Sequence, residues 1–131
     1  MLSRIHELIE RGEDFAFETT LATKSYLSFI QKSKQAGYFV SLVFFWLESP
    51  ELAIARVKKR VSEGGHDIPD EVVKRRYQRG IENLFKLFLD EVNYLLIFDN
   101  SGPDPALIAE KETVLNVMNV SKFEIIKSMA E

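Results

Sequence analysis

Apolar residues recur along the chain with two different periods, which predict five helices and four strands. Spacings of three and four positions are typical of a helix with one buried side. The predicted helices run from Leu2 to Gly12, from Tyr26 to Gly37, from Pro50 to Val61, from Pro69 to Phe88 and from Ser121 to Met129. Ser49 is the expected N-cap of the third, ahead of a proline at its first position. The inner stripes are expected at Leu2, Ile5, Leu8 and Ile9 in the first helix, and at Val73, Tyr77, Ile81, Leu84 and Phe88 in the fourth.

Shorter apolar runs predict the strands. Phe15-Ala16-Phe17 is expected to be a buried strand that ends in Glu18-Thr19-Thr20. Residues 40–47 are nearly all apolar, as expected for a strand covered on both faces. Residues 94–98 form a third apolar run, and residues 113–117 predict a short strand. Between the last two, Pro103 and Pro105 are expected to break the chain.

Strands that alternate with helices favour an α/β fold with a parallel sheet and flanking helices. The length of 131 residues, of which 46% are hydrophobic, suits a single domain over 1–131. The absence of cysteine excludes a disulfide scaffold, a cysteine nucleophile and an iron–sulfur cluster. No apolar run reaches 18 residues and the N-terminus has no signal-peptide core, so we expect a cytoplasmic protein that does not bind membranes.

The net charge of −3 conceals a basic segment. Residues 56–79 contain eight Lys or Arg and four Asp or Glu, so the rest of the chain is acidic. Arg56 and Arg60 share one helix face, as do Arg75 and Arg79, and a glycine loop with His66 separates the pairs. This lid-like hairpin predicts a local anion site rather than a nucleic-acid surface. Two solvated helix faces that flank a loop are the alternative interpretation.

Polar residues follow the predicted strands, where ligands collect in parallel α/β sheets. They are Glu18-Thr19-Thr20, Glu48-Ser49 and Asp99-Asn100-Ser101. The Glu18 carboxylate could hydrogen-bond a ligand hydroxyl, or it could cap the next helix together with Thr20. The sequence contains no G-x-x-x-x-G-K-[ST] phosphate loop and no G-x-G-x-x-G motif.

Several of these motifs together resemble the zeta-toxin-like P-loop kinases, a group also described as predicted ABC-type ATPases. The resemblance runs from about Ile5 to Ser101. It rests on Phe15-Ala-Phe-Glu-Thr-Thr-Leu21, Ala36-Gly-Tyr38, Ser49-Pro-Glu-Leu-Ala53, Arg56-Val57, Arg60-Val61, Gly64-Gly-His-Asp-Ile-Pro69, Arg75-Arg-Tyr77, Arg79, Asn83-Leu84 and Asp99-Asn-Ser101.

The resemblance implies ATP-dependent phosphoryl transfer to a small acceptor, with Mg²⁺, as zeta toxins phosphorylate the sugar of UDP-N-acetylglucosamine. It implies that Arg60 and one residue of the His66-Asp67 loop lie where the family places charge-stabilising residues and that Arg79 lies in the family's basic helix, and we expect the catalytic roles at Arg60 and Arg79. Acceptor or phosphate binding would fall to Glu18, Thr20, Arg56, His66, Arg75 and Arg76. The adenine end of ATP would pass Asn100 and Ser101. No residue of this chain is expected to bind the metal directly, and the resemblance implies an antitoxin protein as a partner.

The sequence departs from the family pattern in two places. The family pattern opens with a strand and a phosphate loop that are not found in these 131 residues, so we expect the match to start about one-third of the way into that pattern, or the gene product to be longer. Ala22 stands where zeta toxins carry a basic residue, with Lys24 nearby. We therefore expect this chain alone to bind Mg²⁺–ATP unproductively and to be inactive as a kinase. The alternative is a non-catalytic remnant that binds anions or a protein.

The missing strand would lie between residues 15–18 and residues 40–47 in the strand order that the resemblance implies. Either these two segments close onto each other, or their free edges pair with another chain. We expect the second outcome, a homodimer or a larger homo-oligomer, because residues 40–47 carry no charge that would oppose it.

Overall fold

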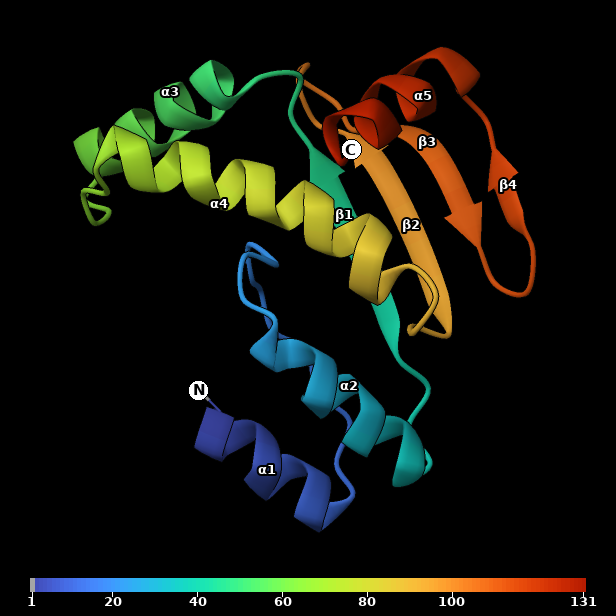
Figure 1. Cartoon of the computed structure of the whole chain (residues 1–131). Helices are drawn as coiled ribbons and strands as arrows, with labels where there is room; N and C mark the ends of the chain where they lie inside the picture. The colour runs from blue at the N-terminus through green and yellow to red at the C-terminus, as the bar shows by residue number, and fades with distance from the viewer. Residues whose placement is uncertain (1) are drawn as a thin grey trace.

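A four-stranded mixed sheet lies at the centre of the fold (Figure 1). The computed structural model describes residues 2–131, apart from the side chains at positions 2, 3, 5 and 6. The strands are β1 (Ser41–Trp46), β2 (Tyr94–Asp99), β3 (Ala106–Lys111) and β4 (Leu115–Val117), in spatial order β1-β2-β3-β4. Only β1 and β2 are parallel. The α/β class is confirmed, and the prediction of a parallel sheet is wrong beyond this first pair.

The five predicted helices are confirmed. They are α1 (Leu2–Arg11), α2 (Ser25–Gln35), α3 (Pro50–Ser62), α4 (Asp70–Asn83) and α5 (Val120–Met129). The predicted N-cap of α3 is present, because the Ser49 hydroxyl accepts a hydrogen bond from the Leu52 amide at 3.1 Å. The stripe expected at Leu2 and Ile5 falls on side chains outside the described set.

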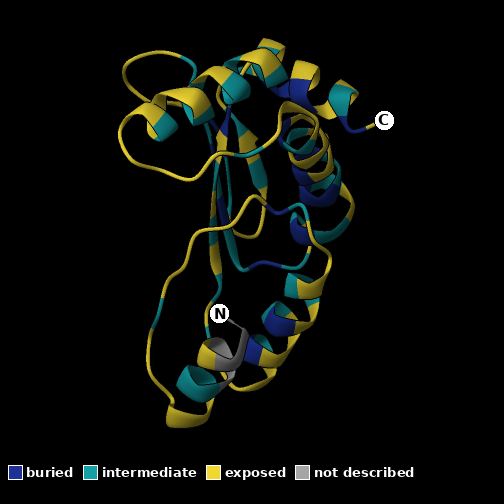
Figure 2. Ribbon diagram, turned by 90° about the vertical axis from the view of Figure 1, so that its left-hand side faces the viewer, coloured by how far each residue is buried: buried dark blue, intermediate teal, exposed yellow. Residues whose placement is uncertain are grey.

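One face of the sheet carries most of the core. Helices α2, α4 and α5 lie on that face, as the side view shows (Figure 2). The predicted inner stripe of α4 packs there, and a π-helical turn (Leu84–Phe88) extends the helix. Leu84 and Phe88 are fully buried against Leu95 and Ile97 of β2. The inner stripe therefore continues through this turn, since Ile81, Leu84 and Phe88 are all buried in the core.

The other face of β1 is open, so the prediction of a strand covered on both faces is wrong. Trp46 is buried, whereas Val43 and Phe45 are 45% and 53% exposed. Successive side chains of a strand point to opposite faces, and the described helices leave Val43 and Phe45 on the second face open to solvent (Figure 2). Phe45 instead stacks on Phe98 of β2, with ring centroids 5.6 Å apart.

Residues 15–17 do not form the predicted strand. A strand needs a partner for its backbone groups, and the described residues offer none beside this segment. Aromatic contacts hold it instead: Phe15 meets the edge of Tyr38 at 5.8 Å, and Phe17 stacks on Tyr26 at 5.2 Å. The outer edge of β1 likewise has no strand beside it among the described residues, since β2 is its one neighbour in the sheet.

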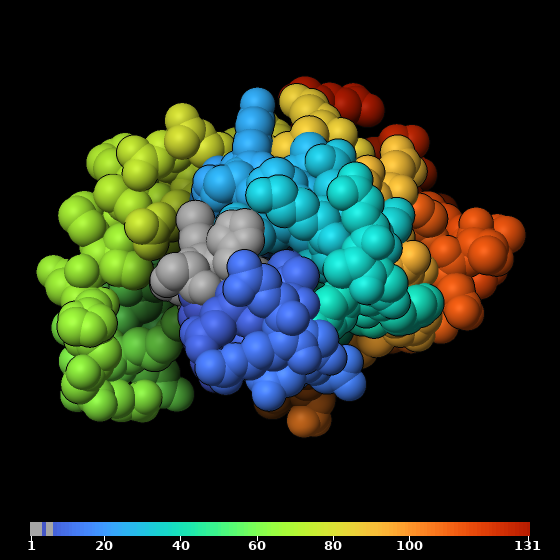
Figure 3. Space-filling view, turned by 90° about the horizontal axis from the view of Figure 1, so that it is seen from below, coloured from blue at the N-terminus to red at the C-terminus, as the bar shows by residue number. Residues whose placement is uncertain are grey.

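Strand β3 was not predicted. It begins directly after Pro105 and ends in Glu110 and Lys111, and its apolar run from Ala106 to Ala109 is only four residues long. It forms because β2 supplies an antiparallel edge, with a register irregularity between Ile97 and Phe98. Viewed from below, residues 7–44 lie at the centre of this face, with the α3–α4 hairpin to one side and β3–β4 to the other (Figure 3).

Candidate functional site

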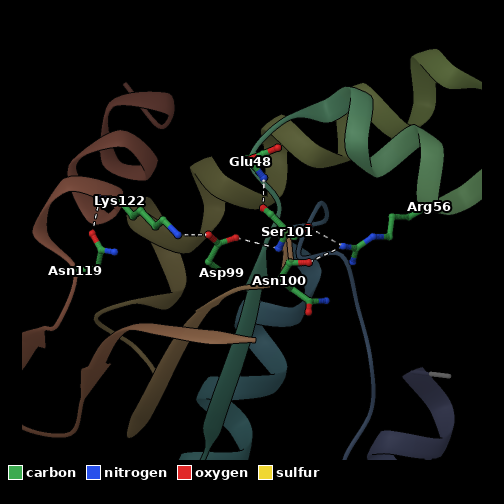
Figure 4. Close-up of polar contacts among 7 residues, drawn as sticks. All are labelled: Glu48, Arg56, Asp99, Asn100, Ser101, Asn119 and Lys122. Atoms are coloured by element: carbon green, nitrogen blue, oxygen red, sulfur yellow. Dashed lines mark hydrogen bonds and ion pairs between the residues drawn. The ribbon is translucent and has the colours of Figure 1, made fainter. Parts of the chain in front are cut away.

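The carboxyl ends of β1 and β2 meet at one edge of the sheet, because the two strands are parallel (Figure 4). The loops that follow them are tied together. The Asn100 amide donates to the Trp46 carbonyl at 2.7 Å, and the Glu48 amide donates to the Ser101 hydroxyl at 2.9 Å. The predicted cofactor residue Ser101 is therefore engaged in joining the two loops.

Asp99, the last residue of β2, is buried at this edge and binds groups from α5 and from the loop after β2. Its side chain is 9% exposed and forms an ion pair with Lys122 of α5 at 2.5 Å (Figure 4). Its other oxygen accepts a hydrogen bond from the Ser101 amide at 2.9 Å. Burial raises the pKa of Asp99, but the hydrogen bonds from Lys122 and Ser101 outweigh it and hold the pKa below its usual value. No local sequence pattern indicates Lys122, which lies 23 positions further along the chain.

Arg56 is drawn into the same network. Its guanidinium Nη2 donates to the carbonyl oxygens of Asn100 at 2.7 Å and Ser101 at 3.3 Å (Figure 4). The side chain is half-buried, and these bonds direct it at the loop after β2. The structure therefore places this predicted substrate residue in support of the loop, whereas Arg60, the other member of its pair, is exposed.

The α3–α4 hairpin closes as the sequence predicts. The Gly65 amide donates to the Arg60 carbonyl at 2.7 Å, and a Cβ at position 65 would lie 2.9 Å from that oxygen. Only a glycine fits so close to the end of α3. His66, in the loop beyond it, is exposed.

A groove of about 720 Å³ lies between β1, the turn at residues 16–21 and the α3–α4 hairpin. Its walls include apolar side chains of β1 and the indole of Trp46. Five of the predicted site residues line it, drawn from four separate segments of the chain. They are Glu18, Thr20, Arg60, Arg76 and Asn100.

The remaining predicted residues lie outside the groove. His66, Arg75 and Arg79 are exposed on the hairpin and do not line it. Arg75 and Arg79 share a face of α4, and the intervening Arg76 is turned by about 100° from its neighbour, which brings it to the groove. The three arginines are grouped together in the sequence, but the rotation of the helix places only Arg76 at the groove.

Hydroxyl groups and a carboxylate line one part of the groove, and two guanidinium groups line another. Such a set can hydrogen-bond a hydroxylated ligand and neutralise a phosphate at the same time. Within the described part of the chain, no group of three His, Asp or Glu side chains could hold a metal ion. None of the described helices has the length and apolar character needed to cross a bilayer.

Comparisons with known proteins give one family. The family model described as Zeta toxin matches residues 3–104, which is most of the chain. An uncharacterized protein of Haemophilus influenzae is 35% identical over 72 residues, which cover 55% of this chain and 51% of the relative. The match thus spans about half the length of that relative. No solved structure matches the chain.

Proposed function

The chain belongs to the zeta toxin family, and from this premise we propose that it forms the acceptor-binding and lid portion of an ATP-dependent phosphotransferase. One observation carries the proposal: Glu18 and Thr20 line the same groove as Arg60 and Arg76. A hydroxyl acceptor requires hydrogen-bonding groups, and a transferring phosphoryl group requires positive charge. The ligand class is a small phosphorylated molecule with free hydroxyls, and a nucleotide sugar is the first candidate.

In this proposal each groove residue has a distinct task. The Glu18 carboxylate accepts a hydrogen bond from the acceptor hydroxyl and so orients it. Arg60 and Arg76 bind phosphate oxygens through charge-assisted hydrogen bonds. Arg76 takes the place beside Arg60 that was expected for Arg79, because Arg79 lies outside the groove.

The residues present do not fit Mg²⁺–ATP as a whole. The 131-residue sequence has no G-x-x-x-x-G-K-[ST] loop to cradle the phosphates, and the described residues include no cluster that could hold the metal. The groove suits the acceptor and the phosphate that it faces, with Asn100 at its border. We therefore assign binding, and not turnover, to this chain by itself.

The purified chain is expected to release no ADP above background when mixed with ATP, Mg²⁺ and UDP-N-acetylglucosamine. The reason is the missing phosphate cradle, without which the transferring group is not positioned. A coupled ADP-release assay measures this. Release that scales with protein and disappears in an Arg60→Ala/Arg76→Ala variant would contradict the expectation and require a cradle of another kind.

Inorganic phosphate and UDP-N-acetylglucosamine are expected to bind the chain weakly, with an affinity that falls as salt rises. The Arg60→Ala/Arg76→Ala variant should lose at least about tenfold in affinity, because a hydrogen bond to a charged group contributes about 1.5–3 kcal/mol. Isothermal titration at two salt concentrations measures both effects.

The matched control is Arg75→Ala/Arg79→Ala, which removes the same charge from the same hairpin but outside the groove. It should bind within about twofold of the wild type once salt screens long-range attraction. Equal losses in both variants would mean that the net charge of the hairpin, and not the groove, attracts the ligand.

We propose a protein-binding role as the second candidate, with a second copy of this chain as the partner. The free edge of β1 and the exposed side chains of Val43 and Phe45 favour it. Edges of this kind pair readily with another strand unless charge, proline or a bulge opposes it.

A further inference from the structure

The turn at residues 18–21 has a strained backbone. Among the described residues, Leu21 is the one non-glycine residue with a positive φ, at +60°. This left-handed conformation is unfavourable for a branched apolar side chain and persists only where the surroundings impose it. Leu21 is only 4% exposed and belongs to the core, so the surroundings that impose it belong to the fold.

Helix α4 supplies two contacts that hold the turn. The side-chain amide of Asn83 donates to the Leu21 carbonyl at 2.6 Å, and this side chain is itself buried. One helical turn earlier, Gly80 allows the Thr20 carbonyl to approach so closely that a Cβ there would lie 2.5 Å from the oxygen. No side chain other than hydrogen fits at that distance.

The turn also stabilises its own shape. The Thr19 hydroxyl accepts a hydrogen bond from the Leu21 amide at 3.2 Å, and the Thr20 hydroxyl accepts one from the Ala22 amide at 3.4 Å. These bonds are local, so they define the curvature of the turn but not its place on α4. Its place depends on Asn83 and Gly80.

We propose that Asn83 and Gly80 are positioning residues, which fix the turn on α4 so that Glu18 and Thr20 face the groove. The inference rests on the proposed function, since the groove is the site that the turn serves. Gly80 lowers the helix propensity of α4. Burying the Asn83 amide costs free energy unless it finds a hydrogen-bond partner, and its partner is the carbonyl of the left-handed Leu21. A role in positioning the ligand-binding turn accounts for the glycine within α4, the buried amide of Asn83 and the left-handed backbone of Leu21.

The test uses two variants of the full chain, Gly80→Ala and Asn83→Leu, with Lys74→Ala on the exposed side of α4 as the control. Gly80→Ala raises the helix propensity of α4 but forces the Thr20 carbonyl away. Asn83→Leu keeps a similar volume but removes the donor to Leu21. Amide hydrogen exchange at residues 19–22 is expected to rise at least about tenfold in both variants and to stay unchanged in the control.

Ligand binding separates positioning from general stability. Affinity for UDP-N-acetylglucosamine is expected to fall about tenfold in both variants, the equivalent of about 1.4 kcal/mol, because Glu18 and Thr20 are displaced. Affinity for inorganic phosphate should stay within about twofold, because Arg60 and Arg76 lie on other parts of the hairpin. If Asn83 and Gly80 only stabilise the fold, the two affinities should change together.

Each remaining outcome decides the matter. Unchanged exchange at residues 19–22 with unchanged sugar-nucleotide binding would overturn the positioning role, while the proposed function would stand. If the wild type binds no UDP-N-acetylglucosamine, the proposed acceptor is wrong. The positioning role is then tested by amide hydrogen exchange alone. Faster exchange confined to residues 19–22 supports it, and faster exchange throughout α4 and the core refutes it. Asn83→Leu answers the question if Gly80→Ala does not fold.

Discussion

At low micromolar concentration the chain is expected to sediment as a dimer or a larger homo-oligomer, above the 15.1 kDa of the monomer. The outer edge of β1 has no strand beside it among the described residues, and the strand lines the groove. A second strand would pair with this edge and cover Val43 and Phe45. Micromolar association corresponds to about 8 kcal/mol, which such an edge and its exposed apolar face can supply together.

A lysine placed on β1 should weaken this association. In Val43→Lys the charge lies on the exposed face of the edge strand, where burial in an interface would require its desolvation. We expect the dissociation constant to rise at least about tenfold, equivalent to about 1.4 kcal/mol. Sedimentation velocity over a range of concentrations measures it.

The control is Val114→Lys, the same substitution at a side chain that is 66% exposed, at the turn between β3 and β4. It should leave the dissociation constant unchanged. A wild-type chain that sediments cleanly as a monomer and unfolds cooperatively would show that hydration suffices for the edge of β1, and association would then be ruled out.

Asp99→Ala is expected to destabilise the fold by about 2–3 kcal/mol. The substitution leaves the Ser101 amide without its acceptor and removes the partner of Lys122. The loss stays below that of a fully buried ion pair because the Lys122 side chain is 40% exposed and can reach water. Urea denaturation monitored by circular dichroism measures the change, and Asp104→Ala in the exposed loop after β2 is the control.

The contribution of Asp99 should also depend on pH in a defined direction. Its pKa in the folded state lies below the unfolded value of about 3.9, so the stabilisation is fully present above that value. It is lost as pH falls through the lowered folded-state pKa. The stability difference between wild type and Asp99→Ala should therefore be constant near neutral pH and shrink below about pH 4. A difference that grows on acidification would contradict the assignment of an ionised Asp99.

The helices could be predicted from the sequence because their signals are local. Ser49-Pro50 marks the start of α3, and the spacing of Val73, Tyr77 and Ile81 marks the inner side of α4. The strands were less predictable because a strand exists only beside another. Phe15–Phe17 has the composition of a strand and no neighbour to pair with among the described residues, whereas Ala106–Lys111 follows two prolines with a short apolar run and pairs with β2.

The kinds of residue in the candidate site could be predicted from the sequence, but not which of the predicted residues line the groove. The motifs named Glu18, Thr20, Arg60, Arg76 and Asn100, which do share one groove. They also named Arg56, which instead supports the loop after β2 through two carbonyl contacts. The contacts of Asn83 and Lys122 join segments far apart in the sequence, so they depend on how α4 and α5 pack and not on any local pattern.

The fluorescence of Trp46 can report on the groove. Trp46 is the single tryptophan of the chain and ends β1 at the groove wall, where its indole is only 4% exposed. Its ring nitrogen is the one buried side-chain polar atom of the described residues without a hydrogen-bond partner. Indole emission shifts in wavelength when the polarity around the ring changes. Intrinsic fluorescence of the unlabelled chain therefore reports from one known place, and a ligand in the groove and a strand docked on β1 would both be visible in the same spectrum.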